Sequence, residues 1–248
     1  VLCQVGLPRS KVEGRTFSRS SGCASMLLEA GQLATKLGTW VEAPLPYGTK
    51  PRLVLYHLCS EAVRTRSPYI DTGGSIRQFL DRIGIARGGR AEADFKKQMV
   101  ALSACRMTLG IFDGQRVTQA KVDPVHTFDA WLSKDPQQKA FWSDEIRLGQ
   151  EFFDTLLEHA VPLDPRAIHA LQHSALCMDI YTWLAHRLCR IRDNRGVKLS
   201  WRNLKEQFGQ EYRVSDDFKK AFKLALFKVR AVYPTAHIDN AIGGLILK

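Results

Sequence analysis

The sequence has no uninterrupted apolar run that approaches the roughly 18 residues of a membrane-spanning helix, which argues against a transmembrane segment and a membrane partner. Residues 1–19 lack a basic stretch followed by an apolar core, so no signal peptide is expected. The six cysteines are scattered and form no Cys-x-x-Cys pair, which is typical of proteins from a reducing compartment. We therefore expect a cytoplasmic protein without a disulfide framework.

Motifs that mark several enzyme classes are also missing. There is no Gly-x-x-x-x-Gly-Lys-Ser/Thr phosphate loop and no Gly-x-Ser-x-Gly nucleophile elbow. A nickase that binds its metal through a His-x-His triplet beside a nucleophilic tyrosine is not indicated, because no such triplet occurs. His169, His173 and Cys177 follow at spacings of four, but without a recognisable fourth ligand they are better interpreted as ordinary surface or core residues. We expect no catalytic residues, no metal site and no cofactor.

Positive charge is what the chain has in excess. Its 248 residues include 36 Lys and Arg against 25 Asp and Glu, which gives a formal net charge of +11. Residues 123–164 hold nine acidic and three basic side chains and so carry −6, which leaves +17 for the rest. The basic side chains gather in three clusters, within residues 9–19, 187–205 and 219–230. Any one cluster could be a solvated surface, but three together favour an anionic partner such as nucleic acid.

Pro, Gly and Ser residues divide the first half into a series of predicted elements. Residues 1–46 read as an irregular basic segment with short strands near Met26–Ala30 and Trp40–Glu42. After it we expect a helix at 51–65, a short strand at 69–71, a helix at 76–83 capped by Ser75, a longer helix containing Phe95, Met99 and Leu102, and a hairpin of strands 107–112 and 116–122. Residues 128–132 are a candidate third strand.

The second half repeats this order. We expect a helix at 174–191, a strand at 197–199, a helix at 201–208 capped by Ser200, a longer helix at 216–233, and strands at 236–239 and 245–247. The letters match as well: residues 75–80 resemble 200–205, and residues 94–99 resemble 217–222, at nearly the same offset. A repeat of this length indicates a duplicated domain, because solenoid units are shorter.

The repeated order is that of a winged helix, in which the second helix of a helix-turn-helix enters the DNA major groove and a β-hairpin follows. We expect an α+β fold with two tandem winged-helix domains in a pseudo-duplicated arrangement, residues 47–135 and 140–248, preceded by the segment 1–46. A groove-entering helix needs one apolar and one basic face, which residues 216–233 supply and residues 91–106 supply more weakly. The first copy could instead be a packing or dimerisation unit that never contacts DNA.

The candidate DNA-binding residues are the basic side chains of these helices and of the strand region before them. From the second recognition helix we expect contacts by Lys219, Lys220 and Lys223, and we expect Lys219→Ala with Lys223→Ala to weaken binding and its salt dependence. Residues 123–164 should face away from the DNA. The remaining candidates are Lys96 and Lys97 on the first recognition helix, Arg202 and Lys205 beside the second, and Arg195 and Lys198 before it.

Several stretches resemble one protein family, the plasmid-encoded RepA-type replication initiators. The most specific are Glu61–Pro68 and Tyr181–Arg187, since neither is demanded by the fold alone. The resemblance spans essentially the whole chain. The other similar stretches are Gly6–Lys11, Gly14-Arg15, Leu45–Gly48, Leu102–Met107, Leu199–Trp201 and Phe208–Tyr212.

This resemblance implies a bacterial protein that binds repeated double-stranded sites, called iterons, at a plasmid origin. It implies that the protein promotes origin opening and recruits the host replication initiator and the replicative helicase. It also implies two winged-helix domains, and monomers that activate replication together with dimers that repress it. We expect a homodimer to form through the first winged-helix domain. The family supplies no residue-level catalytic site, so a non-enzymatic DNA binder is expected.

Two alternatives stay open at this point. The first is a DNA-nicking or relaxing enzyme of plasmid replication, which would cleave a strand and attach to it through a tyrosine. The second is a winged-helix transcriptional repressor that binds duplex DNA but never opens it.

Overall fold

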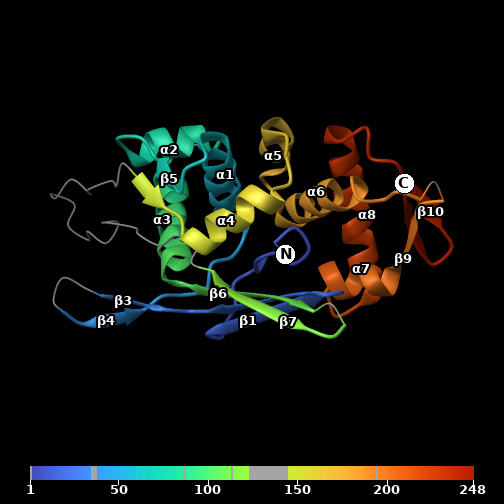
Figure 1. The fold of residues 1–248 in the computed structure, drawn as a ribbon, viewed down its shortest axis with the longest axis horizontal. Helices are drawn as coiled ribbons and strands as arrows, with labels where there is room; N and C mark the ends of the chain where they lie inside the picture. The colour runs from blue at the N-terminus through green and yellow to red at the C-terminus, as the bar shows by residue number, and fades with distance from the viewer. Residues whose placement is uncertain (1, 35–37, 86–87, 113, 123–144, 194) are drawn as a thin grey trace.

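A computed structural model describes residues 2–34, 38–85, 88–112, 114–122, 145–193 and 195–248 (Figure 1). Helices and strands alternate along the chain, and the strands pair into small antiparallel sheets. The expected α+β class is therefore confirmed. None of the helices in these ranges is both long and apolar enough to cross a membrane.

The first half packs three helices beside a four-stranded antiparallel sheet of order β1-β2-β6-β7. The sheet joins the predicted N-terminal segment to the predicted hairpin, because β2 pairs along its length with β6. Residues of β2 alternate between buried and exposed, so Met26 and Leu28 enter the core. The elements are α1 (Thr49–Thr65), α2 (Ile76–Arg82), α3 (Gly89–Ala104), β1 (Thr16–Ser21), β2 (Ala24–Glu29), β6 (Arg106–Phe112) and β7 (Val117–Val122).

Two short strand pairs complete this half. Strands β3 (Gln32–Ala34) and β4 (Trp40–Glu42) pair with each other and project beyond the main sheet (Figure 1). Strand β5 (Tyr69–Asp71) pairs with β8 (Glu145–Arg147), which comes after the range 123–144. The predicted strand at 128–132 lies outside the described residues.

The second half is mainly helical, with one three-stranded sheet of order β10-β11-β9. Two of its helices, α4 and α5, have no counterpart among the sequence predictions. The elements are α4 (Gln150–His159), α5 (Pro165–Leu171), α6 (Ala175–Leu188), β9 (Val197–Ser200), α7 (Trp201–Phe208), α8 (Ser215–Val232), β10 (Ile238–Ala241) and β11 (Gly244–Leu247).

Both halves contain the predicted order of helix, strand, short helix, longer helix and hairpin, but their sheets differ. In the second half the strand before the short helix pairs with the hairpin, since β9 lies beside β11. In the first half the equivalent strand β5 pairs with β8, and the hairpin β6–β7 pairs with β2. The hairpin and the strand before the short helix therefore share one sheet in the second half but not in the first, and the tandem winged-helix arrangement stays a prediction.

Local signals explain why the short helices begin where they do. The Ser75 hydroxyl accepts a hydrogen bond from the Gln78 amide at 3.3 Å, and the Ser200 hydroxyl accepts one from the Asn203 amide at 3.1 Å. Each bond satisfies an N–H group that the first helical turn leaves without a partner. Both caps were predicted from the sequence.

An ionic junction of Arg9, Arg19, Arg52, Asp179 and Glu211 ties the two halves together. Arg52 on α1 makes a bidentate ion pair with Asp179 on α6, with N–O distances of 2.7 and 3.0 Å, and both side chains are buried. Arg52 also donates to the carbonyl oxygens of Leu7, Pro8 and Gly48. Burial alone would lower the pKa of the Arg52 guanidinium, but Asp179 raises that pKa overall.

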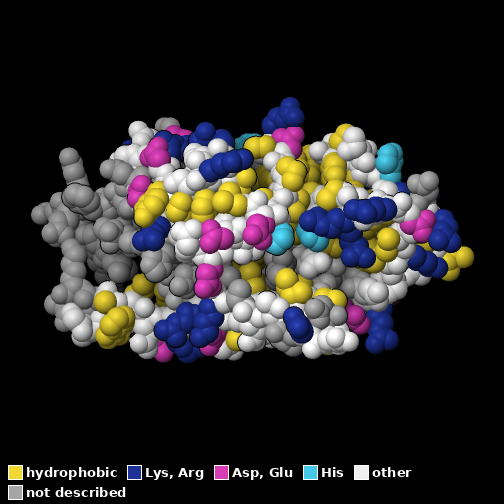
Figure 2. Space-filling view, in the orientation of Figure 1, with side chains coloured by type: hydrophobic (Ala, Val, Ile, Leu, Met, Phe, Trp, Pro, Cys, Tyr) yellow, Lys and Arg dark blue, Asp and Glu magenta, His cyan; other side chains and the backbone are white. Residues whose placement is uncertain are grey.

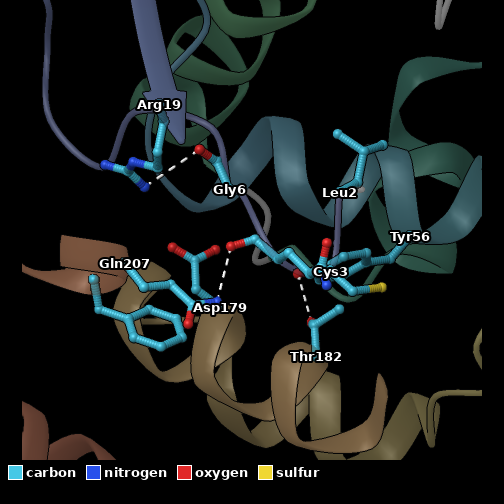
Figure 3. A pocket seen from close by; sticks show the side chains of 10 residues that line it. Leu2, Cys3, Gly6, Arg19, Tyr56, Asp179, Thr182 and Gln207 are labelled. Carbon is cyan, nitrogen blue, oxygen red and sulfur yellow. Dashed lines mark hydrogen bonds between the residues drawn. The ribbon is translucent and has the colours of Figure 1, made fainter. Parts of the chain in front are cut away.

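The N-terminal segment supplies the other half of the junction. Arg9 and Arg19 both bind the carboxylate of Glu211, which follows α7, at 2.9 and 3.0 Å. Gly6 runs between Arg19 and Asp179 (Figure 3), and an added Cβ there would come within 2.8 Å of the Asp179 carboxylate. A glycine therefore allows this close approach.

The ionised carboxylate of Glu211 should make the stability of the protein depend on pH. Burial alone would raise the pKa of Glu211, but Arg9 and Arg19 lower it below its usual 4.5. The unfolded chain then binds this proton more readily than the folded one, so the stabilisation is complete above pH 4.5 and disappears as the pH falls through the lower folded pKa. We expect Glu211→Gln to destabilise the protein at neutral pH, with a difference from wild type that shrinks below pH 4.5. Urea midpoints measured across this pH range test it, and a difference that is constant with pH would contradict it.

Candidate nucleic-acid interface

Helix α8 is held in place by an apolar face and presents a basic one. Phe218, Phe222, Ala225 and Val229 recur at spacings of three and four and are buried. The rings of Phe218 and Phe222 lie 5.6 Å apart and belong to an aromatic cluster with α7. The packing of this face turns the opposite side of the helix to solvent.

The three predicted lysines of α8 differ in their surroundings. Lys219 Nζ lies 3.0 Å from the Asp216 carboxylate, so part of its charge is already neutralised. Lys220 and Lys223 are exposed, and Lys223 Nζ lies 5.5 Å from the centre of the Trp201 ring. Within the described ranges no carboxylate lies within 4.0 Å of either ammonium group. Lys220 and Lys223 are thus better placed than Lys219 to bind phosphates.

The predicted residues of α7 lie beside the start of α8. Arg202 pairs with Glu206 one turn further along, at 3.1 Å. Lys205 Nζ donates to the Ser215 hydroxyl at 3.0 Å and to the Arg213 carbonyl at 3.2 Å. Lys205 therefore links α7 to the turn that leads into α8. A surface hollow lies between the two helices, lined in part by Arg202, Lys205 and Lys219.

Two further candidates lie before α7. Arg195 is exposed and forms a bidentate pair with Asp193 in the turn before β9, at 3.0 and 3.3 Å. Lys198 is exposed on β9, opposite Ile246 of β11. Seven of the nine candidates thus lie in the second half. Three of these seven, Arg195, Arg202 and Lys219, are paired with acidic side chains.

Lys96 and Lys97 are separate from this group. Both are exposed on α3, whose opposite face buries Phe95, Met99 and Leu102. Helices α3 and α8 lie toward opposite ends of the molecule (Figure 1). On the face drawn in Figure 2, Lys and Arg side chains gather over the region of α6 and α8.

The N-terminal basic cluster does not form an open basic surface. Arg9 and Arg19 are largely buried in their ion pairs with Glu211, whereas Lys11 and Arg15 pair with Glu13 and Glu42 near the surface. The three arginines pair with acids far away in the sequence, so composition alone does not reveal these pairs. Lys11 instead pairs with an acid two residues further along. The sequence interpretation missed the whole junction, since no local pattern marks Arg52, Asp179 or Glu211.

The remaining sequence candidates are placed as follows. His169 lies in α5 and Cys177 in α6, with the Ser174 cap between the two helices, so they do not share one helical face. Among the residues that the structure describes, no group of three His, Cys, Asp or Glu side chains could hold a metal. Residues 123–144, about half of the acidic stretch, fall outside the described ranges, and its orientation stays a prediction.

Comparison with protein families gives one match. The family model described as plasmid-encoded RepA protein matches residues 45–203, well over half of the chain. The match covers both sequence stretches that were most specific in the resemblance. A search of curated proteins returned no significant match.

Solved structures with a similar fold come from RctB. Selenomethionine-labelled domains 2 and 3 of RctB superpose with a TM-score of 0.58 and 12% identity, covering 90% of this chain and 80% of that one. A second structure of RctB domains 2–3 gives a TM-score of 0.55 and 11% identity, covering 88% and 78%. At this identity the likeness concerns the fold alone.

Proposed function

The chain belongs to the family of plasmid-encoded RepA proteins, the initiators of plasmid replication, and we propose that it acts by binding repeated duplex sites, iterons, at the plasmid origin. Binding uses two winged-helix units, with α8 as the main groove-entering helix. The observation that carries this proposal is the exposed face of α8, where no carboxylate of the described residues lies within 4.0 Å of the Lys220 or Lys223 ammonium group.

The second unit binds most strongly, because the basic side chains gather there. Lys198 on β9 and Arg202 on α7 are exposed as well, and they bind further phosphates along the DNA backbone in this proposal. Lys96 and Lys97 on α3 give the first unit a weaker contact. Two units on one face of the DNA would meet successive major grooves about one helical turn apart.

Origin opening and recruitment complete the proposed role. Once bound, the protein destabilises the adjacent duplex and brings in the host replication initiator and the replicative helicase. The first unit also serves as the dimer contact. The protein itself has no enzymatic activity in this proposal.

Salt-dependent binding tests the proposal directly. We expect the protein to bind the repeats of its own origin far more tightly than scrambled DNA of equal length. Because lysines and arginines displace counterions from phosphates, log K should fall linearly with log salt, with a slope of about −0.9 for each phosphate contacted. Fluorescence anisotropy over a series of salt concentrations measures both quantities. Equal affinity for origin and scrambled DNA would overturn the proposal.

Two assays separate the proposed function from its alternatives. Supercoiled origin plasmid incubated with the protein and a divalent metal should stay uncut, whereas a nicking enzyme would cleave a strand and remain attached through a tyrosine. Permanganate footprinting should reveal unpaired thymines at the origin only when the protein is present. A repressor would leave the duplex closed.

A further inference from the structure

The exposed face of α8 carries large apolar side chains between its lysines. Phe227 is 74% exposed and Leu224 is 60% exposed, although both are residue types that usually enter a core. The buried positions of the helix lie on its opposite side, so neither residue contributes to the aromatic cluster that holds α8 in place. These two side chains are therefore available to contact a binding partner.

Helical spacing interleaves these two side chains with the basic ones. Leu224 follows Lys220 by four residues, and Phe227 follows Lys223 by four, so each apolar group neighbours an ammonium group on the same face. Lys228 and Arg230, both exposed, extend the basic surface toward the end of the helix. The outcome is a narrow apolar strip bordered by positive charge.

The charge on both sides of the strip decides what it can bind. An apolar protein partner would have to bury the neighbouring ammonium groups without counter-charges, which is costly. A DNA major groove places phosphates beside the strip and base edges in front of it. The apolar group that a base edge presents in that groove is the C5 methyl of thymine.

We infer that Leu224 and Phe227 read thymine methyl groups in the major groove, while Lys220 and Lys223 bind the adjoining phosphates. This inference rests on the proposed function, because it requires α8 to enter the groove. It assigns sequence preference to the middle of α8. The first turn is less suited to that role, since Asp216 and Asp217 there would be repelled by phosphates.

Replacing thymine by deoxyuridine tests the inference, because it removes only the C5 methyl. The probe is a duplex that the wild-type protein selects from a pool of random sequences, prepared in a thymine and a deoxyuridine form. We expect wild type to bind the thymine form more tightly, by about fourfold in Kd for each methyl that it contacts. The variant Leu224→Ala with Phe227→Ala should bind both forms equally.

A control variant and separate readouts keep the interpretation clear. Leu157→Ala removes a 46% exposed leucine from α4 and should keep the full thymine preference. The inference would be overturned if wild type showed no preference for thymine, which is the result expected if the strip docks a protein instead. It would also be overturned if the double variant kept the full preference. Each single variant should lose part of the preference. If the protein selects no sequence and its binding does not depend on salt, the proposed function itself fails. If the protein selects a sequence and binds it with a steep salt slope but shows no preference for the thymine methyl, only the inference fails and the proposed function stands.

Discussion

Asp179→Asn is expected to lower the free energy of unfolding by about 3–5 kcal/mol, the usual cost of removing one partner from a buried ion pair. Asparagine keeps the size of the side chain, but it leaves Arg52 buried without a counter-charge. Arg9 would also lose a carboxylate 3.9 Å away. Because Asp179 joins α6 to α1, the effect should reach both halves. Chemical unfolding followed by circular dichroism gives the measurement.

A matched substitution at the surface provides the control. Glu61→Gln makes the same chemical change within a surface pair, where Glu61 is half-buried and its partner Arg64, one turn further along α1, is exposed. An exposed pair is worth less than about 1 kcal/mol, so this variant should unfold almost like wild type. If the two variants lower the free energy of unfolding by the same amount, Asp179 does not hold the two halves together as the junction geometry requires.

Lys220→Ala with Lys223→Ala should cause the largest loss of DNA affinity among paired substitutions of the described lysines. Each lysine that binds a phosphate adds about 0.9 to the salt slope, so the slope should fall by about 1.8, and affinity near 0.1 M salt should fall roughly 50-fold. The choice of Lys220 over Lys219 follows from the structure, since Asp216 already binds Lys219 at 3.0 Å. Lys219→Ala with Lys223→Ala should therefore have a smaller effect.

A second pair of lysines controls for net charge. Lys11→Ala with Lys121→Ala removes the same two charges from exposed positions outside the candidate interface. If general electrostatic attraction alone drove binding, the two double variants would lose the same DNA affinity and the same amount of salt slope. A slope change confined to Lys220 and Lys223 supports binding through α8, and equal changes would count against it.

The sequence by itself determined the local features of this protein. Capping serines, turn glycines and apolar periodicity act over a few residues, so they predicted α1 to α3 and α6 to α8 to within a few residues. Sequence similarity within the chain also indicated the repeated order of elements. The stretches 61–68 and 181–187 pointed to the family that the matched range 45–203 then established.

Only the tertiary structure decided which strands pair and which charges are available. Arg9 and Glu211 are 202 residues apart, and Arg52 and Asp179 are 127 apart, so no local pattern links them. An arginine in a basic cluster looks the same in the sequence whether it faces DNA or a buried carboxylate. Its role depends on what folding packs against it, because burial makes a charge costly unless a partner is present. The same packing buries one face of α8 and leaves Lys220, Lys223, Leu224 and Phe227 exposed on the other.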